Sequence, residues 1–124
     1  MTLKELYSSI DGDFEQAQKV LRVEKLIDKH IRKFAKNGVI ENVIKAAEGL
    51  DPTAMFETAH AMKGVCANLG LVKLAQIASD LSEEFRPGNA RQMTDEQVGD
   101  MVREIGAIYR KTADGIARYE NSLM

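Results

Sequence analysis

Apolar residues recur with helical spacing along almost the whole chain of 124 residues. Sustained alternation of apolar and polar residues, which would indicate β-strands, is almost absent. The pattern therefore predicts an all-α protein. A clear example is the helix predicted over 23–36, whose buried face would consist of Val23, Ile27, Ile31 and Phe34.

Turn and capping residues place the ends of a second long helix over 52–69. Asp51 can cap its first turn, and Pro52 suits that turn because no helical hydrogen bond is lost there. Gly70 can adopt the left-handed conformation that ends many helices. A third helix, predicted over 71–86, follows directly.

The last long helix is predicted over 95–121, because Thr94 and Gln97 form a capping-box pattern ahead of it. Shorter helices are predicted over 2–9, from Phe14 onward and over 39–48. Together these elements predict an antiparallel four-helix bundle with short N-terminal helices, formed by residues 1–124 as a single domain. Its long helices would be those at about 23–36, 52–69, 71–86 and 95–121.

Composition and charge are typical of a soluble globular protein. Hydrophobic residues make up 44% and charged residues 29% of the chain, and its net charge is −2. This charge provides no overall attraction to nucleic acid or to an anionic membrane. No segment approaches the roughly 20 apolar residues that a membrane-spanning helix needs, and no signal peptide is evident. We expect a cytoplasmic monomer whose single Cys66 is reduced.

Positive charge is concentrated in the segment 19–36. A basic amphipathic helix could lie on a membrane or bind an acidic partner. The chain has no tryptophan to anchor such a helix, so a solvated helix face is favoured. His30 has no ligand-type companion and is interpreted as a residue at the edge of the core. The basic residues are Lys19, Arg22, Lys25, Lys29, Arg32, Lys33 and Lys36.

His60 is predicted to point into solvent from the helix over 52–69. With a rotation of about 100° per residue, Lys63 and Gly64 lie about 60° and 40° to either side of it, and Ala67 lies almost in line with it. These four residues would form one exposed patch. The apolar residues fall on the opposite side of the helix, at Met55, Met62, Val65, Cys66 and Leu69.

The glycine at position 64 would make this patch accessible to another molecule. A glycine inside a helix costs about 1 kcal/mol relative to alanine, and this one occupies no core position. Its missing side chain would let another molecule approach the imidazole of His60 closely. A neutral imidazole is a nucleophile, and Lys63 would attract an anion. The patch therefore suits phosphoryl transfer, which depends on access, alignment and charge neutralisation.

The stretch AHAMKGVCANLGLVKLAQIASDL, residues 59–81, resembles the motif of histidine-containing phosphotransfer (HPt) domains. Met62 replaces the usual leucine, which conserves volume. A looser resemblance extends upstream to about Phe14. The matched positions are Ala59, His60, Lys63, Gly64, Asn68, Leu69, Gly70, Leu74 and Leu81.

The resemblance implies a phosphorelay intermediate. His60 would accept a phosphoryl group from the aspartate of a response-regulator receiver domain, on the ring nitrogen away from the main chain, and pass it to another regulator. Lys63 would lie near the phosphoryl oxygens, and Gly64 would leave room for the receiver. A hybrid sensor histidine kinase is a further expected partner. The receiver would supply the Mg²⁺ ion, so no cofactor is expected in this chain.

Four other residues join the predicted surface to different degrees. Phe56, Glu57 and Ala67 are candidates for the docking face, although packing against a neighbouring helix explains Phe56 equally well. Arg86 could reach the phosphate if the helices over 52–69 and 71–86 pair antiparallel, but a solvated arginine near a loop is the more usual case.

Two alternatives compete with phosphotransfer. Glu57 and His60 have the spacing found in di-iron bundles, but those sites need two such pairs pointing inward. A non-catalytic helical adaptor, which would bind receivers or other signalling proteins without carrying phosphate, remains the main alternative. No catalytic triad and no phosphate-binding loop can be assembled, and nothing resembles the ATP-binding domain of a kinase, so autonomous enzyme activity is not expected.

Overall fold

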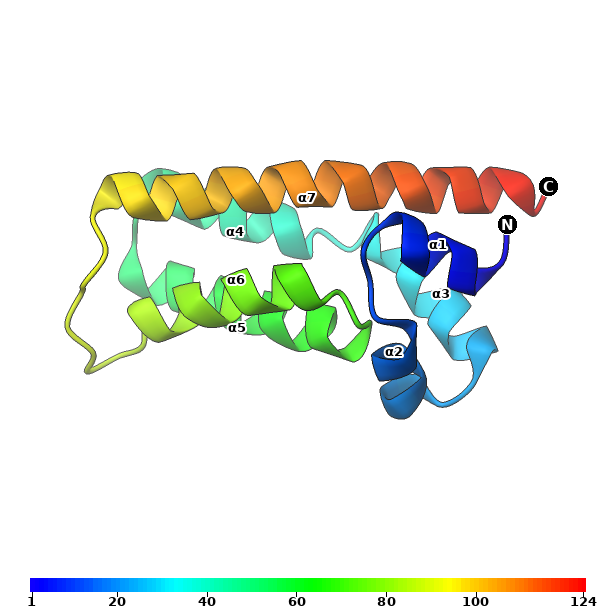
Figure 1. The fold of residues 1–124 in the computed structure, drawn as a ribbon. Coiled ribbons are helices and arrows are strands. Elements are labelled where there is room, and N and C mark those ends of the chain that lie inside the picture. Colours follow the sequence, from blue (N-terminus) through cyan, green and yellow to red (C-terminus); the bar gives the residue numbers. More distant parts are fainter.

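The computed structural model describes residues 1–124 and contains seven helices and no strand (Figure 1). The predicted all-α class is confirmed. None of the helices combines the length and the hydrophobicity needed to cross a lipid bilayer. The helices are α1 (Leu3–Ser9), α2 (Phe14–Leu21), α3 (Glu24–Phe34), α4 (Val39–Gly49), α5 (Pro52–Asn68), α6 (Val72–Glu84) and α7 (Asp95–Ser122).

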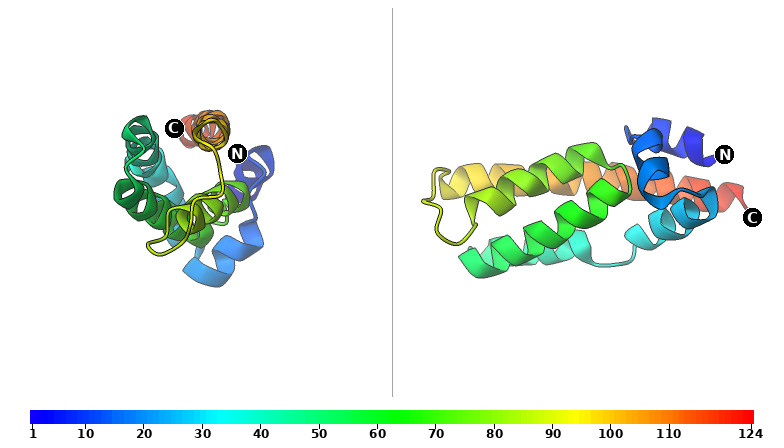
Figure 2. Two further views of the ribbon diagram at one scale, coloured as in Figure 1. Left: turned by 90° about the vertical axis from the view of Figure 1, so that its left-hand side faces the viewer. Right: turned by 90° about the horizontal axis from the view of Figure 1, so that it is seen from below.

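Helix α5 lies between α4 and α6 and packs on both of them (Figures 1 and 2). The long helix α7 runs the length of the molecule and contacts α4, α6, α1 and α3. Helices α1 and α3 contact the C-terminal half of α7, and α2 packs beside both of them. Helix α2 also contacts α5, so the N-terminal segment supports the helix that carries His60.

The helix that packs beside α5, together with α6, is α4 and not α3, although the helix over 23–36 was expected among the four long helices of the bundle. Helix α3 ends at Phe34, and Gly38 begins the next helix in a left-handed conformation with φ 76°. Ile40 and Val43 of α4 are buried, and α3 packs mainly against α2 and α7. The break around Gly38 separates the two helices predicted on either side of it, and it is the second that adjoins α5.

The turn between α5 and α6 is held by the N-terminal segment. Gly70 has φ +70°, as its predicted role as a left-handed helix stop requires. The N–H of Leu71 donates to the carbonyl of Cys66 at 2.9 Å, which closes the end of α5. The hydroxyl of Tyr7 donates to the carbonyl of Leu69 at 2.7 Å, and the N–H of Asp13 donates to the carbonyl of Gly70 at 2.8 Å.

Replacing Gly70 with alanine is expected to destabilise the fold by at least about 2 kcal/mol. An added Cβ would lie 2.1 Å from the carbonyl oxygen of Asp13, and the positive φ is unfavourable for any side chain. Chemical denaturation measures the free energy of unfolding. The matched control is Gly88→Ala, which also has a positive φ but would place its Cβ in open space. Equal losses in the two variants would contradict the role assigned to the Asp13 contact.

Candidate functional site

Helix α5 buries one face and exposes His60 on the other. Its buried residues are Met55, Ala59, Met62 and Cys66, and His60 is exposed, as the angular argument predicted. Gly64 is also exposed, whereas Lys63 and Ala67 are half-buried rather than fully exposed. Val65, predicted in the core, is only half-buried.

The residues next to Gly64 leave its position open. A Cβ built on Gly64 meets no atom within 4 Å outside its own local helix backbone. Packing inside the protein therefore gives no reason for glycine at this position of α5. The free space lies on the helix face that carries His60, one turn along. This is the geometry expected where a second molecule must approach the ring.

The side chains of His60, Phe56 and Arg86 form a continuous stack. The rings of Phe56 and His60 are stacked, with centroids 5.7 Å apart and planes inclined by 23°. The guanidinium carbon of Arg86 lies 5.4 Å from the centroid of the Phe56 ring. Arg86 follows the C-terminus of α6, so the pairing of α5 with α6 brings it to the site. Phe56 is therefore neither a core residue nor a fully exposed one, because its half-buried ring lies between the guanidinium of Arg86 and the imidazole of His60.

Arg86 is held by Glu83, a residue that the sequence analysis did not assign to the site. Its Nε and Nη2 atoms donate to the Oε1 atom of Glu83 at 3.0 and 2.7 Å. The hydrogen bond from Arg86, and more weakly the charge of Lys63, holds the pKa of the Glu83 carboxyl below its usual range. The same hydrogen bond raises the pKa of Arg86. Of the two cations predicted to serve a phosphoryl group, Arg86 thus binds this carboxylate directly and Lys63 acts on it only weakly.

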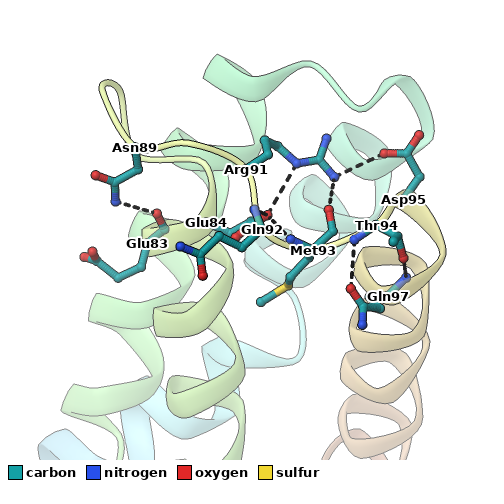
Figure 3. A network of polar contacts seen from close by, with 9 residues as sticks. All are labelled: Glu83, Glu84, Asn89, Arg91, Gln92, Met93, Thr94, Asp95 and Gln97. Carbon is teal, nitrogen blue, oxygen red and sulfur yellow. Dashed lines mark hydrogen bonds and ion pairs between the residues drawn. The ribbon is translucent and has the colours of Figure 1, made fainter.

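The loop that follows Arg86 is fixed by Glu84 (Figure 3). Its Oε2 atom accepts the N–H groups of Gln92 and Met93 at 2.9 and 2.7 Å and pairs with Arg91 at 3.4 Å. Burial opposes the ionisation of Glu84, but the hydrogen bonds outweigh it, so the pKa of this carboxyl lies below its usual range. These contacts tie the returning loop to the end of α6.

A shallow hollow of about 300 Å³ adjoins the site on the α6 side. Lys63 and Ala67 line it from α5, and Gln16 reaches it from α2. The α6 residues of this hollow were not predicted to belong to the site, although their spacing places them opposite the buried side of that helix. They are Val72, Ala75, Gln76 and Ser79.

The remaining candidates for chemistry lie elsewhere. No group of three or more histidine, cysteine or acidic residues is placed to hold a metal ion, and Glu57 is exposed. His30 is exposed rather than at the edge of the core, and it lines a separate hollow with Lys33 and Asn68. Burial raises the pKa of the Cys66 thiol to about 12, so this thiol is a poor nucleophile.

Comparison with known families agrees with this arrangement. The family model of the Hpt domain matches residues 3–110, which include all of α1 to α6 and the first half of α7. Comparison with curated proteins and with solved structures gave no significant match. Because the match spans most of the chain, this protein is a member of the Hpt domain family.

Proposed function

We propose that this protein is a phosphorelay intermediate that carries a phosphoryl group on His60 between receiver domains. One observation carries the proposal: the imidazole is exposed on α5 beside a glycine whose missing side chain opens onto free space. Lys63 and Arg86 supply positive charge to the same face. Membership of the Hpt family makes phosphotransfer in two-component signalling the expected class of activity.

The transfer step needs no proton donor in this chain. The lone pair on Nε2 of neutral His60 attacks the phosphorus of the receiver's aspartyl phosphate. The bond between phosphorus and the aspartyl oxygen breaks, and its electron pair leaves with the carboxylate. Lys63 neutralises charge on the phosphoryl oxygens, and Arg86 is a second candidate for this role. The reverse reaction passes the group to the next receiver.

The receiver would dock across the exposed face of α5 and α6. Gly64 provides clearance, while Phe56, Glu57 and Ala67 contribute to the docking face from α5. Val72 and the other residues of the α6 hollow extend this face. Mg²⁺ would be supplied by the receiver, and a hybrid sensor histidine kinase would lie upstream. We further propose that α4, α5, α6 and α7 form an antiparallel four-helix unit and that the protein acts as a cytoplasmic monomer.

Two phosphodonors test the proposal. Phosphoramidate, a small donor, should phosphorylate His60 directly, with ammonia as the leaving group, and phosphorylated receiver domains should do so by docking. The product should be labile in acid and stable in alkali, and ³¹P NMR should show a single phosphohistidine when a receiver domain is the donor. Binding of receivers without labelling by either donor would overturn the proposal and identify the chain as a non-catalytic adaptor.

A further inference from the structure

We propose that Glu83 is a positioning residue that holds Arg86 against Phe56, one ring away from the acceptor, and competes with the phosphoryl group for it. In the unphosphorylated protein Arg86 is bound to Glu83. When His60 is phosphorylated, Arg86 turns to the phosphoryl oxygens and Glu83 loses its partner. The competition limits the lifetime of phosphohistidine. This inference rests on the proposed function of His60 and adds a determinant of how long the group is retained.

The first step of the proposal depends on the stack of Arg86, Phe56 and His60. Arg86 lies over Phe56, and Phe56 lies against the ring of His60. The cation–π attraction acts on a guanidinium anywhere within about 6 Å of the ring centroid, so Arg86 can turn its N–H groups toward the edge of Phe56 without losing all of it. Arg86 is therefore separated from the ring of His60 by one aromatic ring, and its pair of hydrogen bonds to Glu83 keeps it there.

The second step depends on how weak the ion pair between Glu83 and Arg86 is. Glu83 and Arg86 are separated by one turn, and their side chains are 55% and 44% exposed. Exposed pairs of this kind are weak, so water and other anions can replace either partner. A phosphoryl group carries nearly two negative charges and can accept two parallel hydrogen bonds from a guanidinium. It is therefore the stronger ligand once it is attached to His60.

The third step concerns Lys63, which would also be attracted to the phosphoryl group. Lys63 is close enough to Glu83 to lower the pKa of its carboxyl. A phosphoryl group on His60 would attract Lys63 as well as Arg86, leaving Glu83 ionised near a second anion without the hydrogen bonds from Arg86. That repulsion is present only in the phosphorylated state. It would raise the free energy of the phosphohistidine and favour onward transfer.

The test measures the lifetime of phosphohistidine in the whole protein after phosphorylation by phosphoramidate and removal of the donor. Glu83→Gln should lengthen the lifetime about two- to fivefold, the range that corresponds to breaking one exposed ion pair. Glu83→Asp should restore most of the wild-type rate. Asp80→Asn is the matched control, because it removes the same charge one turn earlier in α6, where the carboxylate accepts a hydrogen bond from Gln76 rather than from an arginine.

A double variant separates positioning from a general charge effect. If Glu83 acts through Arg86, the effect of Glu83→Gln should disappear in an Arg86→Gln background. A persisting effect, or an unchanged or shorter lifetime in Glu83→Gln alone, would overturn the inference while leaving His60 as the acceptor. Failure of every variant and of the wild-type protein to form phosphohistidine would instead overturn the proposed function, and this inference with it.

Discussion

Replacement of His60 by glutamine is expected to abolish phosphorylation of the chain. Glutamine has a similar length and polarity, but its amide nitrogen has no available lone pair to attack phosphorus. No other side chain near the site can take over, because the Cys66 thiol is buried in the core. Incorporation of labelled phosphate from a receiver domain measures the loss, which should be complete with this donor.

The chain supplies its own control for this experiment. His30 is the only other histidine, and like His60 it is exposed on a helix. Its neighbours in the hollow are Lys33 and Asn68 rather than an open glycine. His30→Gln should therefore label like the wild-type protein with a receiver as donor. Substantial labelling of His60→Gln, or loss of receiver-dependent labelling in His30→Gln, would contradict the assignment of the acceptor.

The exposed position of His60 also predicts that its substitution leaves the fold intact. Surface substitutions away from caps and buried networks usually change the free energy of unfolding by no more than about 0.5 kcal/mol. The ring of His60 contacts Phe56, so a small loss of stacking is the only structural cost. Equal denaturation midpoints for His60→Gln and the wild-type protein would show that loss of labelling reports chemistry and not unfolding.

The direction of His60 could be predicted from the sequence because α5 has a single apolar side. Met55, Met62 and Cys66 can be buried together only if the opposite side faces solvent. The left-handed conformation of Gly70 was predictable for a similar reason, since few residues other than glycine end a helix that way. Both predictions depend on local geometry, which the order of residues determines closely.

The choice between α3 and α4 as the neighbour of α5 could not be predicted in the same way. Both segments have a clear apolar face, with Ile27 and Ile31 in α3 and Ile40 and Val43 in α4. Periodicity identifies which residues are buried but not which helix they are buried against. The contacts between α4 and α5 and the attachment of the N-terminal helices to the turn at Gly70 are tertiary features.

The polar contacts around the end of α6 could also be predicted only in part from the sequence. The spacing of Glu83 and Arg86 permits an ion pair on one helix, and this signal could have brought Glu83 into the site. The placement of Arg86 over Phe56, however, depends on how α5 and α6 pair. The hydrogen bonds from Gln92 and Met93 to Glu84 depend on the path of a loop. Neither could be derived from residue spacing alone.

Substitution of Gly64 by glutamine is expected to slow transfer from a receiver domain about 100-fold, because small displacements of reacting groups cost this much. Phosphorylation by phosphoramidate should be nearly unchanged, since a small donor needs little clearance. The fold should become more stable by about 0.5–1 kcal/mol, because glutamine favours a helix more than glycine does. The Cβ meets no atom within 4 Å, so nothing offsets this gain.

Gly106→Gln provides the matched control for this change. Gly106 lies inside α7, and a Cβ there would meet only the Nη1 atom of the Arg110 side chain at 3.6 Å, an ordinary contact. This variant should gain similar stability while transferring phosphate from a receiver at the wild-type rate. Rates are measured by rapid quench with each donor, and stability by chemical denaturation. If Gly64→Gln transferred as fast as Gly106→Gln, the glycine would not be needed for access, and the receiver would have to approach His60 from another side of α5.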